Sequence, residues 1–143
     1  MHIILTLIFV TVVLGFRQPS IGTSTIKSLD KELQDLLLEF YRDTYPEASV
    51  CSITSRSRTC DHLVASARFF SHLIKDGRRI VPSMSAEKGP NSIIQMEFGR
   101  QIFVGQVVSI FKHFQIGVGH PIIFAQVHWF RRSEDVDTEI WDR

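Results

Sequence analysis

Three histidines in the C-terminal half, His113, His120 and His128, first suggest chemistry, because imidazole nitrogen is a common zinc ligand. A zinc site requires its ligands to converge on one ion. His113 and His120 border a short segment that contains two glycines, whereas His128 lies several residue pairs along the strand expected after it. The spacing therefore predicts that the three imidazoles do not converge, and we expect no bound metal.

Cys60 and His62 place a thiol two residues from an imidazole, which could lower the pKa of the thiol and make it a nucleophile. Nucleophilic catalysis also needs an oriented base and an oxyanion site, and the sequence suggests neither. The stretch "GVGH" at 117–120 has two glycines of a dinucleotide fingerprint but lacks the third and opens no helix. We therefore expect a non-enzymatic protein with no cofactor and no small-molecule substrate.

Aromatic and basic residues occur close together around the last two predicted strands. Barrels that bind peptides or nucleic acid combine exposed aromatic rings with basic residues at their rim. The candidate binding residues on this basis are Lys112, Trp129, Phe130, Arg131 and Arg132, with Arg78 and Arg79 as further phosphate contacts. The alternative interpretation is that most of the rings fill the core of a small domain.

Charge is unevenly distributed along a chain whose net charge is only +1. Residues 28–50 carry two Lys/Arg against six Asp/Glu, residues 51–132 eleven against four, and residues 133–143 one against five. A basic middle between acidic flanks could meet phosphate or an acidic protein. The alternative is a solvated face that the flanks neutralise.

Cys51 and Cys60 are the only cysteines and are separated by eight residues rich in Ser and Arg. In a secreted chain they could close a small disulfide loop, whereas in a reducing compartment they would remain thiols.

The elements that would position these residues start with one amphipathic helix. In "SLDKELQDLLLEFYRDTYPEA" apolar residues recur at helical spacing, Ser28 or Asp30 can act as N-cap, and Pro46 ends the run. The period then changes, and Asp76–Gly77 is a strong signal for a tight hairpin turn. We expect five strands, at about residues 66–74, 78–83, 92–98, 101–113 and 122–130.

Alternation along the last two strands predicts which side chains share a face. In the last strand we expect Ile123, Ala125, Val127 and Trp129 on one face and Ile122, Phe124, Gln126, His128 and Phe130 on the other. In the strand before it, we expect Phe103, Gly105, Val107 and Phe111 together, opposite Val104, Gln106, Val108 and Ile110. Gly105 in mid-strand indicates a bulge or a sharp bend.

The chain opens with an apolar run at residues 3–14, too short for a spanning helix of about 20 residues. One interpretation is a signal-peptide core with a cleavage point near Gly15. The other is a false or internal start, in which the run is a buried strand or helix of a longer parent protein.

The stretches "NSIIQMEFGRQIFVGQVVSIFKHF" and "IIFAQVHWFRRSEDVDTEIWD" resemble the β-rich accessory region that lies C-terminal to the transposase core in fungal DNA-transposon proteins. The preceding "SLDKELQDLLLEFYRDTYP" and "DGRRIVPS" are similar to segments found just upstream in that family. The resemblance implies a small barrel of the SH3-like or bromo-adjacent kind, with no catalytic residue. The apolar N-terminal run and the end at "EIWDR" depart from the family pattern, so we expect a truncated fragment.

The predicted architecture is α+β, with one amphipathic helix followed by a five-strand SH3-like or bromo-adjacent-like barrel, truncated at its C-terminal edge. The regions are an apolar signal-like segment (1–16), a linker (17–27), the amphipathic helix (28–50), a basic Cys-containing loop (51–65) and the barrel domain (66–143).

The predicted function is a transposon-derived interaction module that contacts nucleic acid, chromatin or protein, located inside the cell or in the nucleus. The alternative is a small secreted protein with a cleaved signal peptide and one disulfide, and neither interpretation includes a stable membrane span.

Overall fold

The computed structural model describes residues 2–9, 20–75, 77–84 and 92–131, and within them it is an α+β arrangement. The helices are α2 (Lys31–Thr44) and the short 3-10 helix η1 (Pro46–Ala48). The strands are β1 (His2–Phe9), β2 (Ser20–Ile21), β3 (Ser24–Ser28), β4 (Val50–Cys51), β5 (Asp61–His62), β6 (Ser66–Phe70), β7 (Leu73–Lys75), β8 (Arg78–Ile80), β9 (Ile93–Phe98), β10 (Gln101–His113) and β11 (Ile122–Arg131).

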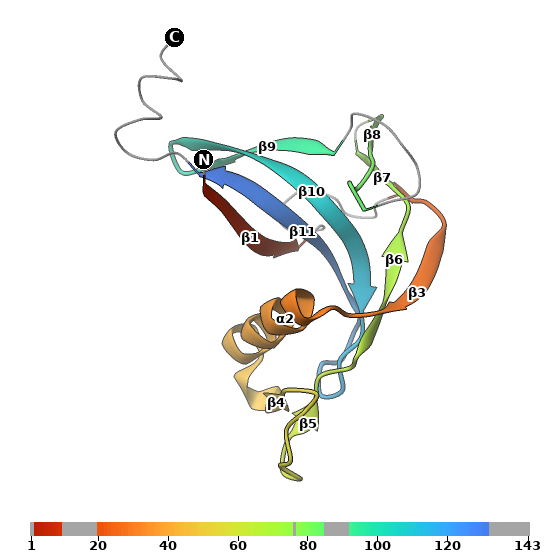
Figure 1. Cartoon of the computed structure of the whole chain (residues 1–143), viewed down its shortest axis with the longest axis vertical. Helices are drawn as coiled ribbons and strands as arrows, with labels where there is room; N and C mark the ends of the chain where they lie inside the picture. Colours follow the sequence, from red (N-terminus) through yellow and green to blue (C-terminus); the bar gives the residue numbers. More distant parts are fainter. Residues whose placement is uncertain (1, 10–19, 76, 85–91, 132–143) are drawn as a thin grey trace.

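One antiparallel sheet organises the molecule, with strand order β1-β11-β10-β6-β3 and with β9 beside the first half of β10. Figure 1 shows that this sheet is strongly curved and that α2 lies on its concave side. Two smaller pairings, β2-β7-β8 and β4-β5, complete the described part. The described residues do not form the expected closed barrel. The two edge strands of the sheet, β1 and β3, do not pair with each other, so the sheet is open.

The helix forms where its apolar period predicts. The Asp30 side chain accepts a hydrogen bond from the Leu33 amide and so caps the first turn, and Pro46 begins η1 after α2 has ended. Leu33, Leu37 and Tyr41 recur on one face and are buried against the sheet. The region expected to be helical, 28–50, therefore contains a shorter helix, and its last residue already belongs to β4.

The five strands predicted after residue 65 are all present, although the first is interrupted and gives β6 and β7. Gly77 has a positive φ of 77° in the turn that joins β7 to β8, as the Asp-Gly signal predicts. Gly99 has a φ of 61° in the two-residue turn between β9 and β10.

Four strands before residue 66, β2, β3, β4 and β5, were not predicted. The segment read as a linker at 17–27 contains β2 and most of β3, which pair with β7 and β6. In the apolar N-terminal run, His2–Phe9 is β1 and pairs antiparallel with β11 over its full length, as the strand alternative predicts. Residues 10–16 of that run and the predicted C-terminal stretch 132–143 lie outside the described residues.

A register shift between Val107 and Ser109 changes which side chains of β10 share a face. Val107 and Ile110 both lie in the same cluster, whereas Phe111 packs with Phe124 in another. The predicted grouping of Phe111 with Val107 is therefore wrong, because one extra residue inverts the alternation beyond it. The bulge lies beyond Gly105 and not at it. The absence of a side chain at Gly105 makes room for the ring of Trp129, which occupies the space that a Cβ there would need.

The predicted alternation of β11 is confirmed, and both of its faces are covered. Ala125, Val127 and Trp129 belong to a cluster on the outer side of the sheet that includes Leu73 and Ile80 from β7 and β8. Ile122 and Phe124 belong to a second cluster on the concave side, with the apolar face of α2. A hairpin between two cores explains why neither face of its sequence is purely polar.

Candidate functional site

The predicted binding residues do not come together on one surface. Trp129 is only 8% exposed and lies in the outer-side core, with its ring centroid 6.3 Å from that of Phe103. Lys112 is opposite Ile123, near the other end of the hairpin from the pair formed by Gly105 and Trp129. At about 3.3 Å per residue the two sites are about 20 Å apart along β11. Trp129 therefore fits the core interpretation.

The other members of that set are also dispersed. Phe130 is half-buried on β11 and Arg131 is the last residue of that strand, while Arg132 lies outside the described residues. Arg78 is exposed on β8 and donates from Nη2 to the Ile93 carbonyl at 2.9 Å. Arg79 is exposed and its Nη2 lies 3.2 Å from Nδ1 of His72.

Two cations do lie side by side on the outer face of the sheet, and we call Arg68 and Lys112 the basic row. Arg68 on β6 is directly opposite Lys112 on β10, and both side chains are exposed. Arg68 donates from Nη1 to the Ser24 hydroxyl at 3.0 Å, and neither cation forms an ion pair with any residue in the described ranges. Next to Arg68 on β3 is Ile26, which is 63% exposed. Like charges directly opposite each other in a sheet repel, so an anion placed between them would be attracted.

A cavity of about 420 Å³ opens on the concave side, between β3, the N-terminal end of α2, β6 and β10. Its walls combine apolar side chains, among them Leu33 and Phe69, with hydroxyl groups and the charged residues Lys27 and Asp30. Sequence reasoning missed this cavity because its walls come from five separate segments. The one local signal was the β-branched pair Thr25–Ile26 in "STIKS", most of which was assigned to a linker.

A buried polar network connects α2 to the end of β10. The Tyr41 hydroxyl is 2.8 Å from Nδ1 of His113, and Nε2 of His113 is 2.8 Å from the Val64 carbonyl. A carbonyl can only accept, so Nε2 carries the proton and Nδ1 accepts from Tyr41. Burial lowers the pKa of His113, and the hydrogen bond to the Val64 carbonyl opposes this more weakly. Burial, and to a lesser extent Tyr45, raises the pKa of Tyr41, which therefore remains a donor.

Gln115 extends this network into the loop that follows β10. It is fully buried, its Oε1 accepts from the Val64 amide at 2.9 Å, and its Nε2 donates to the His62 carbonyl at 3.0 Å. Every polar atom of the network has a partner, so it serves to fix the hairpin against the segment 61–64.

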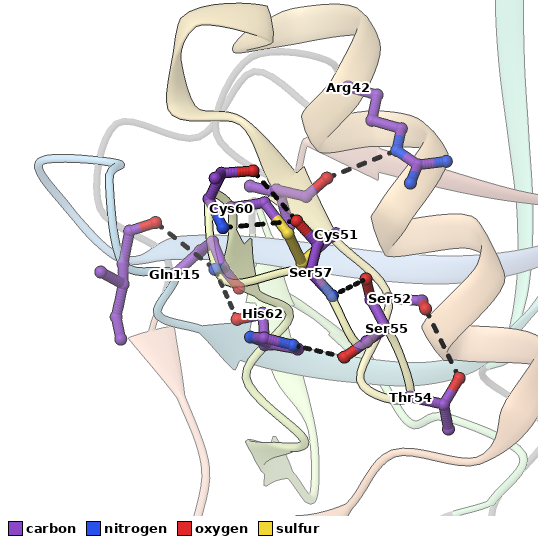
Figure 2. Close-up of a disulfide and its surroundings, with 12 residues drawn as sticks. Arg42, Cys51, Ser52, Thr54, Ser55, Ser57, Cys60, His62 and Gln115 are labelled. Atoms are coloured by element: carbon purple, nitrogen blue, oxygen red, sulfur yellow. Dashed lines mark hydrogen bonds between the residues drawn. A yellow bond between two sulfur atoms is a disulfide. The ribbon is translucent and has the colours of Figure 1, made fainter.

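A disulfide joins Cys51 to Cys60, with their Cα atoms 5.8 Å apart, and this is one of the two states that the sequence left open. Figure 2 shows it at the base of the Ser- and Arg-rich loop, where the His62 ring is hydrogen-bonded to the Ser55 carbonyl at 2.8 Å. Because the sulfur of Cys60 is bonded to Cys51, it is no free thiolate for His62 to activate. Arg56 and Arg58 are exposed on this loop.

In the part of the chain that the structure describes, no group of three or more His, Cys, Asp or Glu side chains is placed to hold a metal ion. His113 is held by Tyr41 and Val64, while His120 is exposed in the loop between β10 and β11. No helix within the described residues is long and apolar enough to cross a membrane.

Comparison with known proteins adds no relative: no family model, no curated protein and no solved structure matches this chain.

Proposed function

We propose that this protein is a non-enzymatic binding module whose basic row contacts the phosphates of a nucleic acid. The observation that carries the proposal is the direct pairing of Arg68 with Lys112 on an exposed face, with neither cation in an ion pair among the described residues. Such a pair weakens the sheet unless a ligand supplies negative charge. Contacts from Arg and Lys to phosphates provide most of the affinity of sequence-independent binding.

The same face indicates the kind of contact. The neighbours of the basic row are the aliphatic Ile26 and Ile123, and the aromatic residues first expected to stack on bases, Trp129 foremost, are largely buried. The basic row itself contains no aromatic residue, although Phe114, two residues beyond Lys112, is 54% exposed. The expected contact through the two cations is electrostatic and independent of base sequence. Arg56, Arg58, Arg78 and Arg79 are further exposed cations in the basic middle of the chain.

Salt dependence tests this proposal directly. Binding to a fluorescent 20-base-pair DNA duplex is measured by anisotropy over a range of NaCl concentrations. Each phosphate contact contributes about −0.9 to the slope of log Kobs against log salt. We expect Lys112→Gln and Arg68→Gln each to reduce the magnitude of the slope by about 0.9, and the double variant by about 1.8.

Lys31→Gln is the matched control, because Lys31 is also an exposed cation but lies on α2 in an ion pair with Asp35. Its slope should equal that of the unaltered protein. No binding at low salt, or equal slopes for Lys112→Gln and Lys31→Gln, would show the proposal to be wrong. Binding to polyglutamate but not to the duplex would assign the basic row to an acidic protein instead.

For the origin of the chain, we propose a transposon-derived module located inside the cell, on the strength of the pattern shared by the last three strands with the fungal transposon proteins. The β10–β11 hairpin, which carries most of that pattern, is the best-connected part of the sheet. This proposal concerns ancestry and location only, and it is independent of the test of the basic row.

The disulfide favours a second candidate, a small secreted protein, because disulfides persist in oxidising compartments. Cleavage near Gly15 would, however, remove β1 and leave β11 without its partner on that side. The intact mass of protein expressed in a eukaryotic host distinguishes the two. Secreted protein lacking about fifteen residues and two protons supports the secreted candidate. Full-length reduced protein in the cell pellet supports the intracellular module.

A further inference from the structure

The cavity on the concave side is distinct from the basic row, and its walls differ in character from one end to the other. Leu33 and Phe69 supply apolar surface, and Leu33 is buried. Thr23, just before β3, and Thr25 and Lys27 on β3 line the side that reaches solvent. The volume of about 420 Å³ lies within the range of pockets that hold small molecules.

Hydrogen bonding at the buried end limits which ligand group can lie there. The hydroxyl of Ser109 lines the cavity and is almost fully buried, and it donates to Oε1 of Gln126 at 3.0 Å. Its proton is therefore in use, and only lone pairs remain for a ligand. An anionic group needs donors, so the buried end suits the apolar part of a ligand.

Two charged residues line the solvent side, and only one of them is available. The Asp30 carboxylate caps α2 by accepting from the Leu33 amide at 2.8 Å. Lys27 forms no ion pair with another described residue, and its Nζ lies 5.9 Å from the centroid of the Phe69 ring. At the mouth of the cavity, the Lys27 ammonium is therefore a cation without an ion-pair partner among the described residues, and it lies above the apolar Phe69 ring.

We propose that this cavity binds a small amphipathic carboxylate, with its apolar body against Leu33 and Phe69 and its carboxylate beside the Lys27 ammonium. Charge complementarity at Lys27 selects the anionic head, and the acceptor-only Ser109 excludes that head from the buried end. The hydroxyl of Thr25 provides a further donor at the mouth, whereas that of Thr23 already donates to the Ser71 hydroxyl at 3.2 Å. The proposal departs from the expectation from the sequence that the protein has no small-molecule substrate.

The test uses isothermal titration calorimetry with two probes of equal chain length, dodecanoate and dodecanol, below the concentrations at which they self-associate. We expect dodecanoate to bind the unaltered protein at least about fivefold more tightly than dodecanol. An exposed ion pair contributes up to about 1 kcal/mol, which corresponds to a fivefold ratio of dissociation constants. Lys27→Met keeps the length of the side chain and removes its charge. It should remove that preference and leave dodecanol binding unchanged.

Two further variants keep the result interpretable. Lys31→Met removes a nearby cation that does not line the cavity and should preserve the preference for dodecanoate. Thr25→Trp places a large ring on the exposed wall of β3, at a position that tolerates aromatic residues, and should abolish binding of both probes. The proposal is overturned if neither probe binds, if both bind equally, or if Lys27→Met and Lys31→Met act alike. Duplex binding, measured on the same Lys27→Met protein, should stay unchanged, which separates this test from that of the basic row.

Discussion

Replacing His113 with Gln tests whether the buried imidazole makes the stability of the protein depend on pH. In the folded protein His113 is neutral, fully buried and bonded on both ring nitrogens. A Gln at this position can donate to the Val64 carbonyl and accept from Tyr41, but it does not titrate. The variant therefore keeps the hydrogen bonds and removes only the protonation equilibrium.

The sign of the effect follows from the lowered pKa of His113. Below the unfolded-state pKa of about 6.5, the unfolded chain binds a proton that the folded protein excludes, so stability falls as the pH falls. The slope is about 1.4 kcal/mol per pH unit until the folded-state pKa is reached. At pH 5.5 the unaltered protein should have lost up to about 1.4 kcal/mol relative to His113→Gln, and above pH 7.5 the difference should be constant.

Urea unfolding at several pH values from 5 to 8, followed by circular dichroism, measures this difference. All other ionisable groups are the same in the two proteins, so their contribution cancels when the two curves are subtracted. Parallel curves of unfolding free energy against pH would refute the reasoning, because they would mean that His113 takes up a proton equally well folded and unfolded.

Two further predictions concern the stability of the fold. Gly105→Ala should destabilise the protein by about 1–3 kcal/mol in urea unfolding, because the new Cβ would lie 2.6 Å from Cε3 of Trp129 and 2.9 Å from the His128 carbonyl. Gly119→Ala, where no atom lies within 4 Å, should change the unfolding free energy by less than about 0.5 kcal/mol, and equal effects of the two would contradict this explanation. Replacing both cysteines with Ser should destabilise the protein by about 2.6 kcal/mol by the loop-entropy relation for a separation of 9, measured against the oxidised protein. Unchanged stability would mean that the bond does not form in solution.

Features that depend on neighbouring residues in the sequence could be predicted. The start of α2 follows from a side-chain oxygen at Asp30 that reaches an amide three residues later. The turns at Gly77 and Gly99 follow from the need for positive φ in short hairpin loops. For Cys51 and Cys60 the sequence allowed two states, a disulfide or two free thiols, because the outcome depends on the redox compartment.

Features that depend on pairing between distant segments could not be predicted. Nothing in the sequence indicates that Arg68 on β6 lies beside Lys112 on β10, or that β3 pairs with β6, and so neither the basic row nor the cavity was predicted. The composition of 17–27, rich in Ser and Thr, is typical of a linker, and tertiary contacts with β6 and β7 override it. The bulge after Val107 has no glycine of its own, and one extra residue was enough to invert the predicted face of Phe111.

The pairing of β1 with β11 has a consequence for how the protein is made. The ribosome synthesises the N-terminal strand first, and its partner is nearly the last strand to emerge. Throughout elongation the apolar run of β1 has no native edge on which to pair, while α2 and the turn-linked hairpins can already form. Sheets that join distant segments fold slowly, and unpaired apolar strands favour aggregation in the meantime. Expression at reduced temperature, or with co-produced chaperones that bind apolar segments, should therefore raise the soluble yield.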